Sequence, residues 1–319
     1  MARESGKVLY VALLGNVAVA VSKFVVAGIT GSSAMMAEAI HSSVDTGNEL
    51  LLFVGLHRSR KPPTPTHPFG HGREVYFWSF LVVIMLFAFG GGLSIFDGIR
   101  GITQPPPLEP PRWNYIVLAL AAIFEGFSWI VGMRELLRRR RPGRSIWEAL
   151  QFSKDPSVIS VVFEDSAALI GILIAAAGLW SSHHWHNPAL DGAASVAIGA
   201  LLACVAILFG REVKGLLVGE AADPEVLRAI REVTASDPDI ESAGDPLTMQ
   251  LGPNQVLLNI ELRFGAGLDR DGIERVIDRI EAEIRRRAPE VTRIYIEAES
   301  LKSDTARELE RRPGSGRAA

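Results

Sequence analysis

Six stretches of the chain are apolar over a length that would cross a membrane as a helix. An α-helix rises about 1.5 Å per residue, so roughly 20 apolar residues span the ~30 Å of hydrocarbon in a bilayer. The six stretches lie near residues 8–29, 33–57, 75–98, 113–134, 156–180 and 188–210. We expect each of them to form a transmembrane helix.

Beyond residue 220 the apolar residues become sparser and periodic, as in a soluble domain. Helical spacing over 223–236 is followed by two strand-like stretches, 245–252 and 255–264, with a Gly-Pro-Asn turn between them. A strongly amphipathic stretch, 269–288, precedes an alternating one, 291–298. The order helix, strand, strand, helix, strand predicts a small open-faced α+β sandwich.

This change of pattern predicts the domain organisation. We expect a transmembrane domain at 1–215, a second domain at 216–301 and a polar, disordered tail at 302–319. The mean hydropathy of +0.21 is high for a soluble protein, and the net charge of −3 gives no indication of a nucleic-acid partner. A single cysteine excludes a disulfide framework.

Basic residues predict the orientation of the helices in the lipid bilayer. The linkers after the second and fourth stretches are rich in Arg and Lys, whereas the linkers TGSSA and SSHHWHNP contain neither. Since basic loops stay in the cytoplasm, both termini are expected there. The first apolar run is too long for the core of a signal peptide, so we expect it to be retained. We therefore expect an integral membrane protein, and we take a bacterial inner membrane as its expected location.

The second stretch contains polar and ionisable residues at membrane depth. Residues 37–53 read AEAIHSSVDTGNELLLF, in which Glu38, His41, Asp45, Asn48 and Glu49 interrupt the apolar sequence. His41 and Asp45 are four residues apart and so share one helix face. A charge at mid-membrane costs about 2.5–3.5 kcal/mol on insertion scales, which a partner, water or a metal must offset. Imidazole and carboxylate together suit zinc, and a hydrogen-bonded pair between helices is the alternative.

The fifth stretch carries two more carboxylates, Glu164 and Asp165, in an apolar sequence. Counted from the outer helix ends at about 1.5 Å per residue, His41 lies about 12 Å deep, Asp45 about 18 Å and Asp165 about 22 Å. Transporters bind their substrates near the membrane midplane. The depths therefore favour a metal site made of these three side chains.

Three motifs together resemble the cation diffusion facilitator family: GSSAMMAEAIHSSVDTGNELLL, RSRKPPTPTHPFGHGREVYFWSF and FEDSAALIG. The resemblance extends over essentially the whole chain. It implies an α-helical polytopic membrane protein with six transmembrane helices and a C-terminal cytosolic α+β domain of ferredoxin-like type. It also implies a homodimeric exporter, not an enzyme, that exchanges zinc or another divalent metal for protons by alternating access. The metal is then the transported substrate, and no cofactor is expected.

The resemblance also implies a tetrahedral transport site with two ligands from the second helix and two from the fifth. His41 and Asp45 match the first pair, and Asp165 matches the second aspartate. The remaining ligand position is occupied by Val161, so the family's set of four is incomplete. Glu164, adjacent to Asp165, or Glu125, about 18 Å deep in the fourth stretch, could complete the coordination or carry the coupled proton. The alternative for Glu125 is a bond to a neighbouring helix.

Three other groups of residues carry expectations. The HPFGHG loop places His67 and His71 four residues apart, as in a secondary metal site of relatives. Thr64, however, stands where those relatives have an acidic ligand. The alternative is a turn that docks the loop against the helices.

Lys23 and Glu38 have matched depths and are expected to form a structural ion pair. In the second domain, the matching positions of zinc-binding histidines in relatives are Asn259 and Tyr295, so we expect metal sensing to be lost there.

Several functional classes remain open on the sequence alone. An exporter of manganese, iron or cobalt is an alternative to a zinc exporter, because a site with one histidine and several carboxylates is rich in oxygen. An intramembrane metalloenzyme would keep an open coordination position, but the chain contains no HExxH motif. A regulatory membrane protein with a vestigial site is the third possibility.

Overall fold

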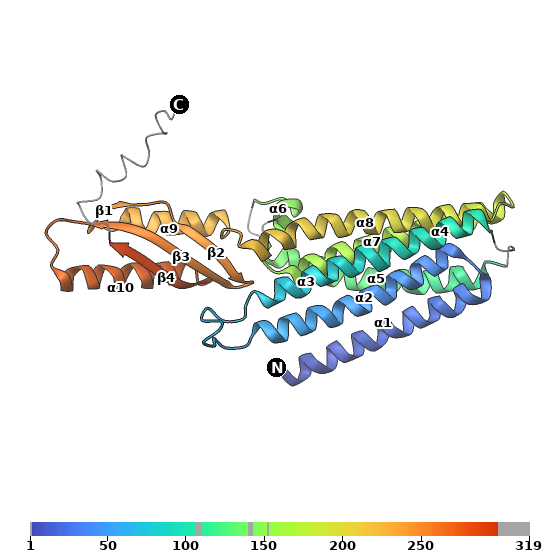
Figure 1. Cartoon of the computed structure of the whole chain (residues 1–319), viewed down its shortest axis with the longest axis horizontal. Coiled ribbons are helices and arrows are strands. Elements are labelled where there is room, and N and C mark those ends of the chain that lie inside the picture. Colours follow the sequence, from blue (N-terminus) through green and yellow to red (C-terminus); the bar gives the residue numbers. More distant parts are fainter. Residues whose placement is uncertain (1, 106, 108–109, 140–142, 152, 299–319) are drawn as a thin grey trace, which may run out of the picture. The chain divides into compact units, whose positions relative to one another are not determined.

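The chain folds into two compact units that meet between Val218 and Gly219. The computed structural model describes residues 2–105, 107, 110–139, 143–151 and 153–298, with side chains from residue 16 onwards except at 139, 151 and 157 (Figure 1). The expected tail at 302–319 lies outside the described residues. Each unit has its own hydrophobic core.

The first unit is helical throughout its described elements. These are α1 (Ala2–Thr30), α2 (Ser33–Ser59), α3 (Glu74–Met85), the π-helix η1 (Leu86–Leu93), α4 (Ser94–Thr103), α5 (Arg112–Arg139), α6 (Ile146–Gln151), α7 (Pro156–His184) and α8 (Ala189–Val218). Because α3, η1 and α4 follow one another without a break, the described part of this unit contains six long helical segments, one at each predicted stretch. The short helix α6 was not predicted, since six residues give too little periodicity.

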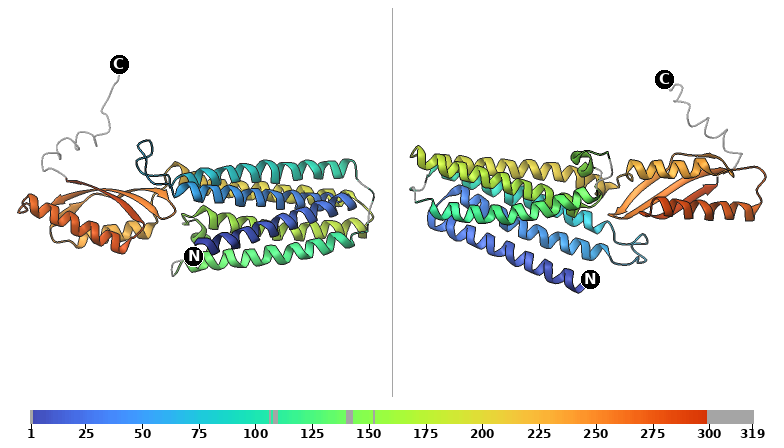
Figure 2. Two further views of the ribbon diagram at one scale, coloured as in Figure 1. Left: turned by 90° about the horizontal axis from the view of Figure 1, so that it is seen from below. Right: turned by 180° about the vertical axis from the view of Figure 1, so that it is seen from behind.

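Four of these segments are long and apolar enough to cross a membrane by composition alone: Glu74–Thr103, Arg112–Arg138, Val158–His184 and Ala189–Val218. In α1 the described apolar part, Asn16–Thr30, is shorter, and α2 contains the ionisable residues noted above. The fold is that of an α-helical polytopic membrane protein. The start of α1, the α2–α3 loop and α6 all lie at one end of the helical unit (Figures 1 and 2).

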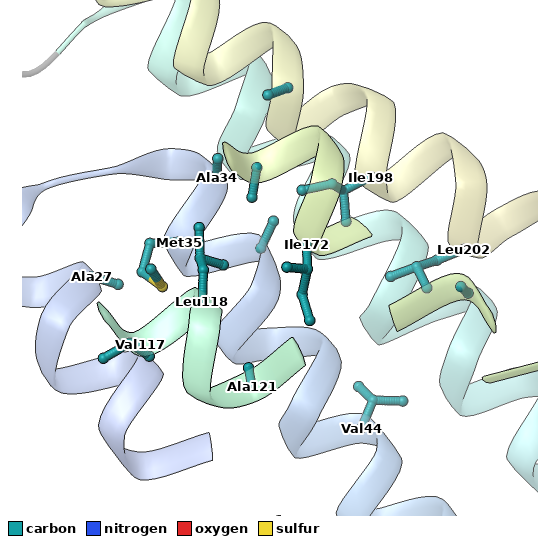
Figure 3. Close-up of a cluster of buried hydrophobic side chains, with 14 of the residues drawn as sticks. Ala27, Ala34, Met35, Val44, Val117, Leu118, Ala121, Ile172, Ile198 and Leu202 are labelled. Carbon is teal, nitrogen blue, oxygen red and sulfur yellow. The ribbon is translucent and has the colours of Figure 1, made fainter. Parts of the chain in front are cut away.

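The core of this unit lies between α1, α2, α5, α7 and α8. Apolar side chains from these five helices gather between the ribbons in Figure 3, including Met35, Leu118, Ile172 and Leu202. At the other end of the unit, Asp191 of α8 accepts hydrogen bonds from the Ser32 hydroxyl and the Ala34 amide. These hydrogen bonds fix the N-terminus of α2.

The second unit is a four-stranded α+β sandwich. Its elements are α9 (Pro224–Ser236), β1 (Ile240–Ala243), β2 (Leu247–Gly252), β3 (Gln255–Phe264), α10 (Arg270–Arg287) and β4 (Val291–Ala298). β3 is the central strand, which pairs antiparallel with β1 and β2 and parallel with β4. The predicted order lacked β1, a four-residue strand whose sequence shows no clear alternation and which forms only against the end of β3.

The two faces of this sheet differ. Alternate residues of β3, such as Leu258 and Ile260, are buried in one core with Ile230 of α9 and Ile280 of α10, so both helices cover the same face. The opposite face carries Leu247 of β2 and Tyr295 of β4, which are 67% and 49% exposed. This second unit therefore presents an uncovered face that contains large apolar side chains.

Candidate functional site

The ionisable residues of α2 form a stripe along one side of that helix. Glu38 and His41 are fully buried, and the side chain of Asp45 is 17% exposed. The Nε2 atom of His41 lies 3.5 Å from Oδ2 of Asp45, one helical turn away, as the spacing predicts. Neither nitrogen of His41 makes a hydrogen bond within the described part of the chain.

A small, partly open cavity of about 50 Å³ lies between α1, α2, α5 and α7. Four of the predicted site residues line it: Asp45, Glu125, Glu164 and Asp165. His41 does not line it. Its walls also include Asn16, Val19, Ser42, Glu49, Leu52, Phe124, Ser128 and Val161. The structure thus brings the predicted carboxylates of three helices together.

Two of these carboxylates keep an oxygen without a partner. Oδ1 of Asp45 and Oδ2 of Asp165 are buried and accept no hydrogen bond from the described residues. Buried polar atoms are nearly always paired, so orphaned ones at a cavity indicate a ligand position. Among the carboxylates of the cavity, Asp45 and Asp165 are therefore the first candidates for ligands.

Glu164 and Glu49, by contrast, are held by neutral side chains. Oε1 of Glu164 accepts a hydrogen bond of 3.0 Å from Asn48 Nδ2 and one of 2.9 Å from the Ser160 hydroxyl. Oε1 of Glu49 accepts one of 2.7 Å from Asn16 Nδ2. Sequence reasoning assigned no role to Glu49 or Asn48. Extending the stripe of α2 by one more turn beyond Asp45 would have found both.

The valine at the missing ligand position is tightly packed. Val161 lines the cavity wall, and its Cγ1 atom lies where a Cβ on Gly132 of α5 would come within 2.7 Å. Glycine at 132 thus allows α5 to approach α7 at this level. Glu125 of α5 lines the same cavity, so a carboxylate lies near Val161, which stands at the missing ligand position.

The carboxylates are not arranged as a finished coordination sphere. Among the described residues, no three His, Cys, Asp or Glu side chains are close enough together to hold a metal ion. His41 faces Asp45 but not the cavity. Metal binding by His41, Asp45 and Asp165 would therefore need side-chain rotation or a shift of α2 against α7.

His67 and His71 lie in the loop between α2 and α3, away from this cavity. Their ring centroids are 4.4 Å apart, and Nδ1 of His71 lies 3.3 Å from Oε1 of Glu74 at the start of α3. Nδ1 of His67 contacts the Thr66 hydroxyl at 3.0 Å. The two rings are thus neighbours, as expected, and a role in metal binding remains a prediction.

In the second unit, the two residues at the positions of the relatives' zinc-binding histidines lie next to each other. Asn259 and Tyr295 are register partners on β3 and β4, and Asn259 donates a long hydrogen bond of 3.4 Å to Glu297. An amide, a phenol and a carboxylate make a poor zinc site compared with imidazole or thiolate ligands. The loss of metal sensing in this unit remains a prediction.

Residues 9–218 match the family described as "Cation efflux transmembrane domain". The chain belongs to the cation efflux, or cation diffusion facilitator, family. This match covers nearly all of the helical unit, including the cavity and both histidines of the α2–α3 loop. Members of the cation efflux family are transporters and not enzymes, which removes the intramembrane metalloenzyme from the alternatives.

Named relatives of this cation efflux protein come from several kingdoms. It is 34% identical over 275 residues to the human "Proton-coupled zinc antiporter SLC30A9, mitochondrial", covering 86% of this chain and 47% of that protein. It is 29% identical to "Metal tolerance protein C4" of Arabidopsis thaliana, covering 82% and 58%. It is 27% identical to "Cation-efflux pump FieF" of Escherichia coli, covering 82% and 81%. The chain thus spans about half the length of the first of these relatives.

Proposed function

We propose that this protein exports a divalent metal ion, zinc in the first place, across its membrane in exchange for protons. One observation carries the proposal: five carboxylates, those of Asp45, Glu49, Glu125, Glu164 and Asp165, line one cavity inside a membrane-spanning unit. Carboxylates at membrane depth are costly and mark ion pathways. The names of the human and bacterial relatives agree with such an activity.

The residues divide into two roles in this proposal. Asp45 and Asp165, which keep free oxygens, bind the ion together with His41 when α2 and α7 move into register. Glu125 and Glu164 complete the coordination that Val161 cannot supply, or carry the coupled proton. Since ligands must be deprotonated to bind a metal, binding releases protons and protonation releases the metal. A site that opens alternately to the two sides then exchanges one for the other.

The choice of metal rests on the donor atoms. Because the cavity is lined by carboxylate oxygens while His41 lies outside its walls, manganese, iron and cobalt are the second candidates beside zinc. We further propose that the protein works as a homodimer, with the uncovered sheet face of the second unit as one contact. Its termini lie on the cytoplasmic side, where the basic linkers are expected.

The test is metal uptake into proteoliposomes that are acidic inside. With the parent protein, we expect zinc to enter as protons leave, at a rate that falls when the pH gradient is removed. Asp45→Asn and Asp165→Asn remove a ligand charge without changing side-chain volume, so each should abolish uptake. The matched control is Asp97→Asn in α4, a membrane carboxylate that does not line the cavity.

Repeating the assay with manganese, iron and cobalt identifies the preferred ion. Size-exclusion chromatography checks that each variant is folded. Transport at the parent's rate by folded Asp165→Asn protein would contradict the assignment of the cavity as the transport site.

A further inference from the structure

A fully buried ion pair lies beside the cavity and takes no part in the mechanism described so far. Lys23 of α1 and Glu38 of α2 are both 0% exposed, with Nζ 3.2 Å from Oε2. The pair confirms the expectation from their matched depths. Burying two charges costs several kcal/mol per ion before their attraction is counted, so such a pair is weak evidence for stability alone.

The ammonium of Lys23 points toward the cavity wall. It donates a second hydrogen bond, of 2.6 Å, to the hydroxyl of Ser42. Ser42 lines the cavity together with Asp45, three residues further along α2. One hydroxyl group therefore separates this positive charge from the space between the five carboxylates.

Glu38 faces a different neighbour. Its Oε1 atom has no hydrogen-bond partner among the described residues and packs against Gly171 of α7, where a Cβ would come within 2.5 Å of it. Glu38 does not line the cavity. The two members of the pair are thus unequal: the cation is held at the cavity wall and the anion against the backbone of α7.

We propose that Lys23 is a positioning residue that sets the metal affinity of the transport site. Its fixed positive charge repels the bound dication, and Glu38 partly offsets that repulsion. A site lined by five carboxylates would otherwise hold a divalent ion too tightly to release it. The proposal rests on the proposed function, since it assumes that the metal occupies the carboxylate cavity.

The two members of the pair should act in opposite directions on metal affinity. Removing the cation leaves the carboxylates unopposed, whereas removing the anion leaves the lysine charge unscreened. Charges interact strongly in the low-dielectric interior, so each change should alter zinc affinity by about tenfold. A purely structural pair would instead lower stability in both variants and leave affinity unchanged.

The experiment is calorimetric zinc titration of the full-length protein in detergent. We expect Lys23→Gln to bind zinc about tenfold more tightly and Glu38→Gln about tenfold more weakly than the parent. The double variant should lie close to the parent, because both charges are gone. In proteoliposomes at saturating zinc, Lys23→Gln should also transport more slowly, since release becomes limiting.

Asp191→Asn is the matched control. Asp191 anchors α2 at its N-terminus but does not line the cavity, so its loss should lower the melting temperature and leave zinc affinity unchanged. If Lys23→Gln does not accumulate as folded protein, Ser42→Ala replaces it. That variant removes the hydroxyl that holds the ammonium at the cavity, and tighter zinc binding is again expected.

Three results decide the matter. Tighter zinc binding by Lys23→Gln together with weaker binding by Glu38→Gln supports the proposal. Any other pattern of affinities in the two variants, with a parent that binds zinc, overturns it while leaving the proposed function intact. A folded parent that neither binds nor transports zinc or another of the tested ions overturns both.

Discussion

The carboxylates around the cavity differ in what holds them. Glu164 is fixed by Asn48 and Ser160, and Glu49 by Asn16. Asp45 and Asp165 keep a buried oxygen without a partner. At the residue scale, then, Asp45 and Asp165 each keep an oxygen that could bind a ligand. Glu49 and Glu164 already accept hydrogen bonds from neighbouring side chains. Glu49 and Glu164 are therefore better suited to setting the charge of the cavity or carrying protons than to binding the ion directly.

The first prediction concerns the substitutes for the missing ligand. Replacing Glu125 and Glu164 together by glutamine should lower zinc affinity or change the number of protons exchanged per ion, because two ionisable oxygens leave the cavity. Calorimetry in buffers of different ionisation enthalpy measures both quantities. Unchanged affinity and proton count in a folded double variant would show that neither glutamate contributes.

The control for this pair is Glu148→Gln with Glu241→Gln. Both of these glutamates are exposed and neither lines the cavity. The same number of negative charges is removed from the protein in both double variants. A change seen only in the cavity variant therefore belongs to the site and not to net charge.

At the scale of elements, α4 and α8 are joined by small residues. A Cβ on Gly98 would come within 2.7 Å of the Gly192 carbonyl oxygen, and one on Gly199 within 2.7 Å of the Ile95 amide. The Ser195 hydroxyl donates to the Ser94 carbonyl oxygen at 2.9 Å across the same contact. Small residues let membrane helices pack backbone to backbone, which is what holds this pair together.

The second prediction tests that contact. Gly199→Ala should destabilise the helical unit by about 1–3 kcal/mol, because the added methyl group meets backbone atoms that cannot rotate away. The matched control is Gly126→Ala in α5, where nothing lies within 4 Å of the new Cβ. Thermal unfolding in detergent compares the two. Equal melting temperatures would contradict the close packing of α4 and α8.

An ion-pair cluster ties α10 to the loop before β1. Arg279 donates hydrogen bonds of 2.7 Å to both Asp237 and Asp239. These bonds hold the pKa of the Asp237 carboxyl below its ordinary value. The side chain of Arg279 is 48% exposed, so the cluster contributes only about 1 kcal/mol or less to stability.

The third prediction is a pH dependence of that contribution. A carboxyl with a lowered pKa stabilises the folded state above its unfolded pKa of about 3.9, and the gain is lost as pH falls through the folded value. Arg279→Gln should therefore be less stable than the parent at pH 7, and the difference should shrink below about pH 4. Urea unfolding of the second unit at several pH values measures it. A difference that persists undiminished in acid would assign the effect to packing.

At the scale of the whole molecule, the helical unit and the sheet unit have separate cores. Within the described part of the chain, the buried cluster of the second unit lies between Ala222 and Val291, and Ile294 and Ile296 pack against it. A domain with its own core can in principle fold alone. We propose that the second unit is an autonomous domain that begins near residue 216 and joins two subunits through its uncovered sheet face.

The fourth prediction follows from that proposal. Residues 219–301, expressed alone, should fold without metal and self-associate as a dimer, because Leu247 and Tyr295 remain exposed on the sheet. Zinc should shift neither the melting temperature nor the dimerisation constant, as this segment contains no histidine or cysteine. Sedimentation and thermal unfolding with and without zinc test both points. Zinc binding at micromolar concentration or tighter would refute the loss of metal sensing.

Leu247→Lys is the informative variant in that fragment. It places a charge on the uncovered face without touching the buried core, so it should abolish dimerisation and leave folding intact. Arg270→Lys is the control, because it keeps the charge of an exposed residue on α10, outside the sheet. Dimers that persist in Leu247→Lys would place the contact elsewhere.

Much of this architecture follows from the sequence by itself. The six helices arise from apolar runs of membrane length, and the long strands from strict alternation, both of which are local properties of the chain. The facing of His41 toward Asp45 follows from helical spacing, and the pairing of Lys23 with Glu38 follows from equal depths in antiparallel helices. These features depend on one coordinate only, the position along a helix axis.

What the tertiary structure decided is the rotation of each helix about its axis. Depth placed His41, Asp45, Asp165 and Glu125 at similar levels, but packing turns His41 away from the cavity and brings in Glu49. Packing also decides that Glu125 lines the cavity. Contacts between residues distant in the sequence likewise set two other features. One is the hydrogen bond from Asn48 to Glu164, 116 residues later, and the other is the pairing of β1 with the end of β3. Rotation is fixed by everything that packs against a helix at once, so no single segment encodes it.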